Sequence, residues 1–319
     1  MMPRSIFAYI AALPAVVMAL PATVRAADPV YPLASHVGLV APSPMQPSQT
    51  FRGFEDKEAG AQILILEVPP KAFPDVEKQM SVEALKKQGM TEEKREPLTL
   101  KGGKGTLIVG QQVADNKKVR KWLLLASTNE VGALIAVQVP DAAKNKYSDN
   151  NVRAALMSTT MRATVPIDEQ LTLLPITFDK TSALRPFRII GNSTVFLTDG
   201  ANDPPDVAAQ PLLIISVAQG GPEQASDRNN FANNLFSSLN DFKEIRITGA
   251  EMLRLDNQQT HEIQATAKDA KTSTPLQLVQ WIRFGNGAFI RFVGIARADV
   301  WKQAFPKFRE VRDATKPRG

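Results

Sequence analysis

The sequence contains no cysteine, and this absence excludes several chemistries at once. Disulfide bonds, thiolate zinc sites and a cysteine nucleophile are all ruled out. A lipid-anchored export signal is ruled out as well, because such a signal needs a cysteine directly after its cleavage site. The stability of the folded chain must therefore come from its hydrophobic cores alone.

Histidine is almost as scarce, since the chain has only His36 and His261. A histidine beside a carboxylate can serve as a general base, which draws attention to His261-Glu262. Neither histidine has neighbours typical of a catalytic triad or a metal site, and the sequence lacks the Gly-x-Ser-x-Gly and His-Glu-x-x-His motifs. We interpret His261-Glu262 as a surface pair and give His36 no chemical role. The sequence predicts no catalytic, metal-binding or cofactor-binding residue.

The sequence also lacks a large excess of one charge, because its 319 residues include 38 Lys and Arg and 32 Asp and Glu. The net charge of +6 falls to +4 without residues 1–26. A balance this mild allows weak attraction to anionic surfaces, but nucleic-acid binding would need a concentrated basic patch, so we predict none. The hydrophobic content of 44% is ordinary for a globular protein, and the length suits two domains.

Long hydrophobic runs are limited to one, over residues 6–20. Arg4 precedes this run, and small residues lead up to Ala26, so residues 1–26 are predicted to be a signal peptide cut after Ala26. The alternative is a membrane anchor, but the run is shorter than the ~20 residues of a spanning helix and contains Pro14. We therefore expect a soluble protein that is exported to the periplasm.

The first half of the mature chain predicts an α+β domain over residues 37–162, after an extended, proline-rich lead-in over residues 27–36. Short turns such as Gly102-Gly103 separate its later strands, which indicates an antiparallel meander. The predicted elements are strands at 37–40, 61–68, 98–100, 105–114, 119–127 and 131–139, a helix over 74–88 followed by Gly89, and a closing helix from Ser148.

The second half repeats this order over residues 182–314, after a linker at 163–181 and before a tail at 315–319. Its predicted elements are strands at 195–199, 212–217, 245–247, 252–255, 261–267, 276–284 and 288–296, a helix with Ser226 as N-cap, a hairpin at Gly285-Asn286-Gly287, and a closing helix with Trp301, Phe305 and Phe308. Matching Ile63 with Leu212, Val76 with Phe231 and Trp122 with Trp281 gives a slowly growing offset, which indicates a diverged duplication.

The segment Phe51-Arg52-Gly53-Phe54-Glu55-Asp56 resembles the start of the PsbP-like fold, and so does the order of elements after it. That family includes an extrinsic subunit of photosystem II and many exported bacterial proteins. The resemblance implies an antiparallel sheet between helices, an α/β/α sandwich, in two tandem copies. The second copy departs from it, because Val195-Phe196-Leu197-Thr198-Asp199 replaces the motif. No functional residue is carried over, and family members with known roles favour a binding or assembly role by analogy.

Four cations at Lys117, Lys118, Arg120 and Lys121 form the one candidate binding site that the sequence predicts. The alternatives are a solvated hairpin turn that protects a sheet edge and a docking point for an acidic partner or anionic lipid. Other candidates favour structural roles. A turn is predicted at Lys101-Gly102-Gly103-Lys104-Gly105-Thr106, because this segment lacks phosphate-loop spacing. Core positions are predicted for Trp122, Trp281, Trp301, Phe305 and Phe308. A loop is predicted at Asp203-Pro204-Pro205-Asp206.

We therefore expect a non-catalytic binding or assembly protein of the bacterial cell envelope, with a protein or another envelope component as its partner. The alternatives are a periplasmic hydrolase that uses carboxylates or hydroxyls, and a carrier of a small apolar ligand between the two domains. An exposed apolar patch on the folded protein would favour a partner, whereas a cleft with clustered carboxylates would favour an enzyme.

Overall fold

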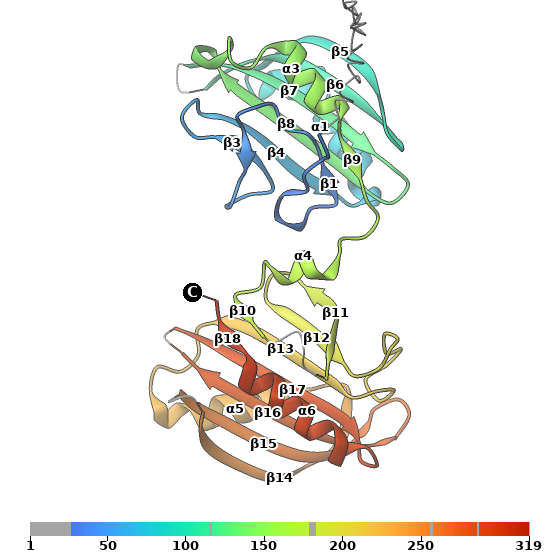
Figure 1. Cartoon of the computed structure of the whole chain (residues 1–319), viewed down its shortest axis with the longest axis vertical. Helices are drawn as coiled ribbons and strands as arrows, with labels where there is room; N and C mark the ends of the chain where they lie inside the picture. Colours follow the sequence, from blue (N-terminus) through green and yellow to red (C-terminus); the bar gives the residue numbers. More distant parts are fainter. Residues whose placement is uncertain (1–26, 115–116, 179–182, 256–257, 286, 319) are drawn as a thin grey trace, which may run out of the picture.

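A computed structural model of the chain describes residues 27–114, 117–178, 183–255, 258–285 and 287–318. The predicted signal peptide and Asn286 of the predicted hairpin lie outside the described residues. Two seven-stranded antiparallel sheets follow one another along the long axis of the molecule (Figure 1). No helix of the described part is long and apolar enough to cross a membrane.

The first sheet has the strand order β2-β3-β4-β8-β7-β6-β5, and the short strand β1 pairs with β9 beside it. The elements are η1 (Pro32–Ala34), β1 (Val37–Gly38), β2 (Gln46–Pro47), β3 (Gly53–Asp56), β4 (Ala61–Val68), η2 (Pro70–Ala72), α1 (Phe73–Gln79), α2 (Val82–Lys87), β5 (Met90–Leu100), β6 (Gly103–Ala114), β7 (Lys117–Ser127), β8 (Gly132–Pro140), η3 (Asp141–Ala143), α3 (Asp149–Met157) and β9 (Thr160–Met161).

The second sheet has the order β11-β12-β13-β17-β16-β15-β14, and β10 pairs with β18 at the end of the chain. The elements are α4 (Ile167–Leu171), β10 (Ile176–Thr177), β11 (Arg185–Ile190), β12 (Thr194–Thr198), β13 (Leu212–Gln219), η4 (Ala225–Asp227), α5 (Arg228–Ser237), β14 (Phe242–Leu255), β15 (Gln258–Asp269), β16 (Pro275–Phe284), β17 (Ala288–Arg297), α6 (Trp301–Ala314) and β18 (Lys316–Pro317).

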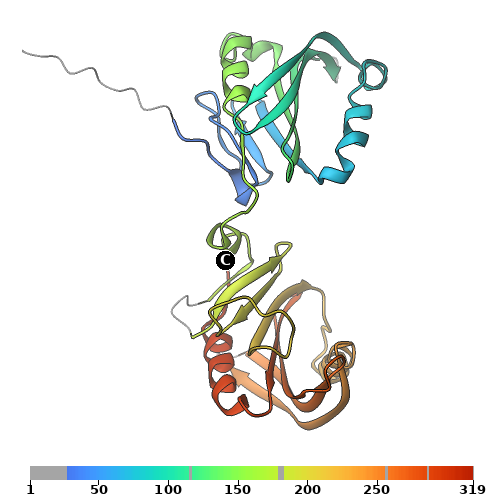
Figure 2. The same cartoon turned by 90° about the vertical axis from the view of Figure 1, so that its right-hand side faces the viewer.

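The two sheets have the same topology, strand for strand, which confirms the predicted tandem α+β architecture. Helices lie on both faces of each sheet, as the PsbP-like resemblance implies (Figure 2). In the first domain α3 packs on the face that holds Trp122, whereas α1 and α2 pack on the opposite face. In the second domain α6 packs on the face that holds Trp281, and α5 on the other.

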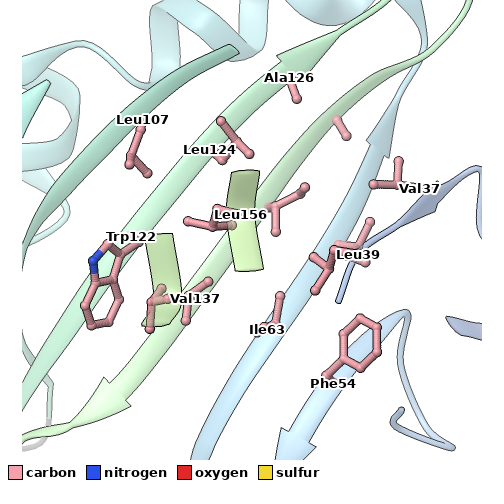
Figure 3. Packing of buried hydrophobic residues seen from close by; sticks show 14 of the residues in the cluster. Val37, Leu39, Phe54, Ile63, Leu107, Trp122, Leu124, Ala126, Val137 and Leu156 are labelled. Atoms are coloured by element: carbon pink, nitrogen blue, oxygen red, sulfur yellow. The ribbon is translucent and has the colours of Figure 1, made fainter. Parts of the chain in front are cut away.

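Cross-strand register shows which positions of the two domains correspond. Trp122 pairs with Val137, which pairs with Ile63 on its other side. Trp281 pairs with Phe292, which pairs with Ile215. The two tryptophans are thus equivalent and buried, as predicted, and Figure 3 shows Trp122 within its apolar cluster. The predicted match of Ile63 with Leu212 is wrong, because the register places Ile215 there.

Three local predictions are wrong for local reasons. The helix over 74–88 is two helices, because Ser81 is extended and its hydroxyl accepts a hydrogen bond from the Ala84 amide as a new N-cap. Ser226 lies inside the η4 turn, and Asp227 takes the N-cap position of α5. The segments 245–247 and 252–255 belong to one strand, β14, whose register is irregular near its start.

The motif at residues 51–56 has a structural role. Gly53 has a φ of 152°, and a Cβ atom there would lie 1.8 Å from the carbonyl oxygen of Ile63, so only glycine fits. Phe54 is buried in the core. Asp56 is buried too, and its carboxylate accepts hydrogen bonds from the Tyr147 hydroxyl at 2.6 Å and the Lys146 ammonium at 2.7 Å. The motif therefore fastens β3 to the segment that leads into α3.

Candidate functional site

The first domain leaves an apolar part of its sheet uncovered. Leu64 and Leu66 on β4 are 45% and 53% exposed, although both lie in the middle of a strand. Their partners on β8 are Ala136 and Leu134, which are half-buried at the edge of the α1–α2 cluster. These four residues form a continuous surface, which we call the open face.

Strand alternation explains why the sequence did not reveal this surface. The run from Ile63 to Leu66 is apolar on both faces of the sheet, which led to the prediction of a fully buried strand. Ile63 and Ile65 are indeed buried, because the cluster under α3 covers their face. Leu64 and Leu66 point to the opposite face, where α1 and α2 cover only the strands further along.

The corresponding face of the second domain is covered by its own chain over only part of β13, and its uncovered part has no leucine. The register that matches Ile63 with Ile215 matches Leu64 and Leu66 with Ser216, which is half-buried, and Ala218, which is exposed. The connection between β12 and β13 is long, and it places Val207 and the buried Ala208 against Leu212 and Ile214. In the first domain the connection between β3 and β4 is a short turn at residues 57–60, which cannot reach the sheet face. The open face is thus specific to the first domain.

Lys121 lies on the same side of the sheet as the open face. It pairs with Gln138 on β8, which pairs in turn with Gln62 on β4, one step along the strand from Leu64. The side chain of Lys121 is half-buried and has no hydrogen bond or ion pair with another described residue. Burial lowers the pKa of this ammonium, because the charged form loses hydration without gaining an anionic partner.

The four cations predicted as one cluster are divided between the two faces of the sheet. Lys117 and Lys121 share the side of the open face, and Lys118 and Arg120 point to the other side. Arg120 forms ion pairs with Glu93 and with Asp149, the latter at 2.9 Å, and the hydrogen bond that Arg120 donates to Asp149 raises its pKa. Arg120 is therefore engaged within the chain, whereas Lys117 and Lys118 are exposed.

His261-Glu262 is not a surface pair, which corrects the sequence-based interpretation. His261 is 2% exposed and lies 2.8 Å from Asn229 of α5, and burial lowers its pKa. Glu262 is 5% exposed on the opposite face, where its carboxylate accepts a hydrogen bond from Trp281 Nε1 and lies 3.7 Å from Arg312. Both side chains are enclosed by the domain, so neither faces a site that a substrate could enter.

His36, to which the sequence assigned no chemical role, lies in a cluster of polar side chains. Its Nδ1 lies 3.0 Å from the Glu67 carboxylate, which also accepts hydrogen bonds from Ser35 and Arg52. Although burial opposes ionisation of Glu67, these donors outweigh it and lower the pKa of the carboxyl. His36, Arg52 and Glu67 line a cavity of about 340 Å³.

The remaining predicted candidates have structural roles. Lys101 and Gly102 form the turn between β5 and β6, where Gly102 has a φ of 82°, so the predicted turn is confirmed. Asp203 pairs with Arg185, and Asp206 accepts a hydrogen bond from the Ala208 amide. In the part of the chain that the structure describes, no three His, Asp or Glu side chains lie together as metal ligands would.

An apolar cavity of about 240 Å³ lies within the second domain, lined by Ile176, Val217 and Phe289 among others. The alternative function as a carrier placed its ligand between the domains. This cavity has no lining residue from the first domain.

Comparisons with known proteins find weak similarities to solved structures and nothing further. No known family matches the sequence, and no curated protein does. Among solved structures, PsbP of Synechocystis sp. PCC 6803 is 14% identical, with 43% of this chain and 93% of that chain covered and a TM-score of 0.30. LpqN of Mycobacterium tuberculosis, described as involved in cell envelope biogenesis, is 12% identical, with 45% and 83% covered and a TM-score of 0.36.

Those two structures match about as much of the chain as one domain contains. A third, the immunity protein TplEi of the T6SS from Pseudomonas aeruginosa, covers 91% of this chain and 97% of its own, at 11% identity and a TM-score of 0.29. At such identities and scores the similarities carry no argument about function.

Proposed function

We propose that this protein is an exported, non-catalytic accessory protein of the cell envelope, which binds a protein partner through the open face of its first domain. The observation that supports the proposal is the uncovered apolar pair Leu64 and Leu66 in the middle of a strand. Contiguous exposed apolar surface rimmed by polar groups is typical of protein interaction sites. The predicted signal peptide supports the location.

The chemistry around the open face indicates what the partner presents. Two leucines and an unpaired, half-buried lysine favour a segment with apolar side chains followed by a carboxylate. Burial of an ammonium that already lacks part of its hydration becomes favourable once a carboxylate pairs with it. Gln62 and Gln138 lie between the leucines and Lys121, and their amides can complete a polar rim.

Site-specific photo-crosslinking in living cells tests the proposal. A benzophenone amino acid at Leu66 should yield one discrete cross-linked protein, and the same substitution at Ile190, which is 55% exposed in the second domain, should not. Reversing the charge with Lys121→Glu should abolish the product at Leu66, whereas Lys118→Glu on the other side of the sheet should leave it. A product twice the mass of this chain, or equal products at both positions, would refute the proposal.

A further inference from the structure

Three adjoining cavities lie at the ends of the strands in the first domain. At this end the chain leaves the domain toward α4 (Figure 1). The cavity of about 340 Å³ beside His36 shares Glu130 and Ala163 with one of about 430 Å³. The latter shares Lys104 and Ser127 with a third of about 300 Å³. Neighbouring cavities share lining residues at the strand ends, and we call the three together the strand-end groove.

Three separate features of the sequence meet in this groove. The glycine-rich turn contributes Gly102, Gly103 and Lys104, the lead-in contributes His36, and the motif at residues 51–56 contributes Arg52. The open face does not use any of them. Their meeting is a property of the tertiary structure, since they come from distant parts of the chain.

Several polar side chains of the groove have no partner within the protein. Lys104, Ser127, Asn129 and Glu130 form no side-chain hydrogen bond or ion pair with another described residue. An ammonium, a hydroxyl, an amide and a carboxylate together supply both donors and acceptors. A ligand with many groups that both donate and accept hydrogen bonds matches this set, and sugar hydroxyls are such groups.

The positive and negative side chains of the groove nearly cancel, which favours an uncharged ligand over a polyanion. Arg52 and Lys104 are opposed by Glu67, Glu77 and Glu130. A polyanion such as a nucleic acid or a phosphorylated chain needs an excess of cations, which this groove lacks. An uncharged ligand does not.

The direction of the groove relative to the strands favours a sugar over a peptide as its ligand. Extended peptides commonly bind by adding a strand to a sheet edge through main-chain hydrogen bonds. This groove runs across strand ends, where side chains and turns form the lining. The half-buried Phe73, whose ring lies beside Gly132, lines the third cavity and gives it an apolar wall, against which the C–H side of a sugar ring can pack.

We propose that the strand-end groove binds an uncharged oligosaccharide, held by Lys104, Ser127, Asn129 and Glu130, with Phe73 under one ring. This site shares no lining residue with the open face, so either proposal can fail alone. A protein with both sites would attach a protein partner to a glycan of the envelope.

Amide chemical shifts of the isotope-labelled protein, followed during titration with chitotetraose, cellotetraose or maltotetraose, test the site. At least one sugar should shift the amides of Gly103, Ser127 and Glu130. Lys104→Ala and Asn129→Ala should each weaken that binding roughly fivefold to tenfold, as expected for the loss of one hydrogen bond. Lys118→Ala is the matched control, because this exposed lysine lies at the far end of β7.

The double variant Leu64→Ser/Leu66→Ser should bind the sugar as the parent does, which separates this site from the open face. The proposal is overturned if none of the three sugars shifts these amides, or if the variants of Lys104 and Asn129 bind as tightly as the control. Shifts in the groove caused by an end-blocked polar tetrapeptide, in place of the sugars, would also overturn it and assign the groove to peptides.

Discussion

The two domains share one topology but fasten their closing helices to the sheet at opposite ends. In the first domain Asp56 of β3 holds Tyr147, directly before α3 begins. In the second, Glu262 of β15 lies beside Arg312 in the last turn of α6. The same fold therefore accepts a buried carboxylate at two places, where the closing helix or the segment directly before it supplies the partner.

Equivalent positions in the other copy are apolar. Val109 pairs with Trp122 just as Glu262 pairs with Trp281, so valine stands in the first domain where the second has its carboxylate. Likewise Leu197 stands in the core where the first domain has Asp56, by the register of β12 on β13. The two domains thus differ by an exchange of apolar and charged residues inside their cores, while their strand order is the same.

Removing the cation of the second domain should give the largest effect. Arg312→Met leaves Glu262 buried without its cation, and loss of one partner of a buried ion pair costs about 3–5 kcal/mol of stability. Denaturant-dependent hydrogen exchange, followed separately over the peptides of each sheet, should show this loss in the second domain alone. Adding Glu262→Gln, which keeps an acceptor for Trp281, should recover most of it. An unchanged second domain would contradict the assigned role of Arg312.

The matching change in the first domain should be smaller. Tyr147→Phe removes one hydrogen bond to a carboxylate, while Lys146 still pairs with Asp56, so we expect a loss of about 1–2 kcal/mol. The same exchange experiment should place this loss over β3 and α3. Equal losses of stability in both domains, or a loss in the second only, would mean that the hydrogen bond between Tyr147 and Asp56 does not stabilise the first domain locally.

Acid should distinguish the two domains further. Hydrogen bonds from Lys146 and Tyr147 hold the pKa of Asp56 far below its ordinary value of 3.8, so this group stabilises the first domain above pH 4. That contribution disappears as the pH falls below 4, when the unfolded chain takes up the proton first. We expect Asp56→Asn to flatten the acid loss of stability over the first sheet and to leave the second sheet unaffected. A parallel acid profile in the variant and the parent would be evidence against this.

The smallest effect on stability should come from the open face. Leu66→Ser removes one side chain that is already 53% exposed, so the unfolding free energy should fall by only about 1 kcal/mol. For comparison, Ala208→Ser places a hydroxyl in the buried contact over β13 and should lower the stability of the second domain by a larger amount. Thermal unfolding of both variants checks the order. A larger loss in the leucine variant would mean that the open face is part of the core.

Periodicity and turn chemistry were sufficient to predict much of the architecture. The meander from β5 to β8 follows from short turns, which exclude parallel crossovers, and the glycine turn at Gly102 follows from its need for a positive φ. Trp122 and Trp281 were predicted in the core from the apolar runs that contain them. The helix over 74–88 failed at Ser81, where a local capping hydrogen bond competed with the helix.

The sequence by itself determined most of the order of elements, the tandem arrangement and the buried tryptophans, because these depend on local spacing and recur along the chain. Only the tertiary structure decided that Glu262 is buried, that the basic turn is divided between two faces, and that Leu64 and Leu66 stay uncovered. Alternation tells which side chains share a face of a strand, but not what covers that face. The cover comes from segments distant in the chain, such as Arg312 for Glu262 and Ala208 for the second sheet, and the first domain has no such segment over its leucines.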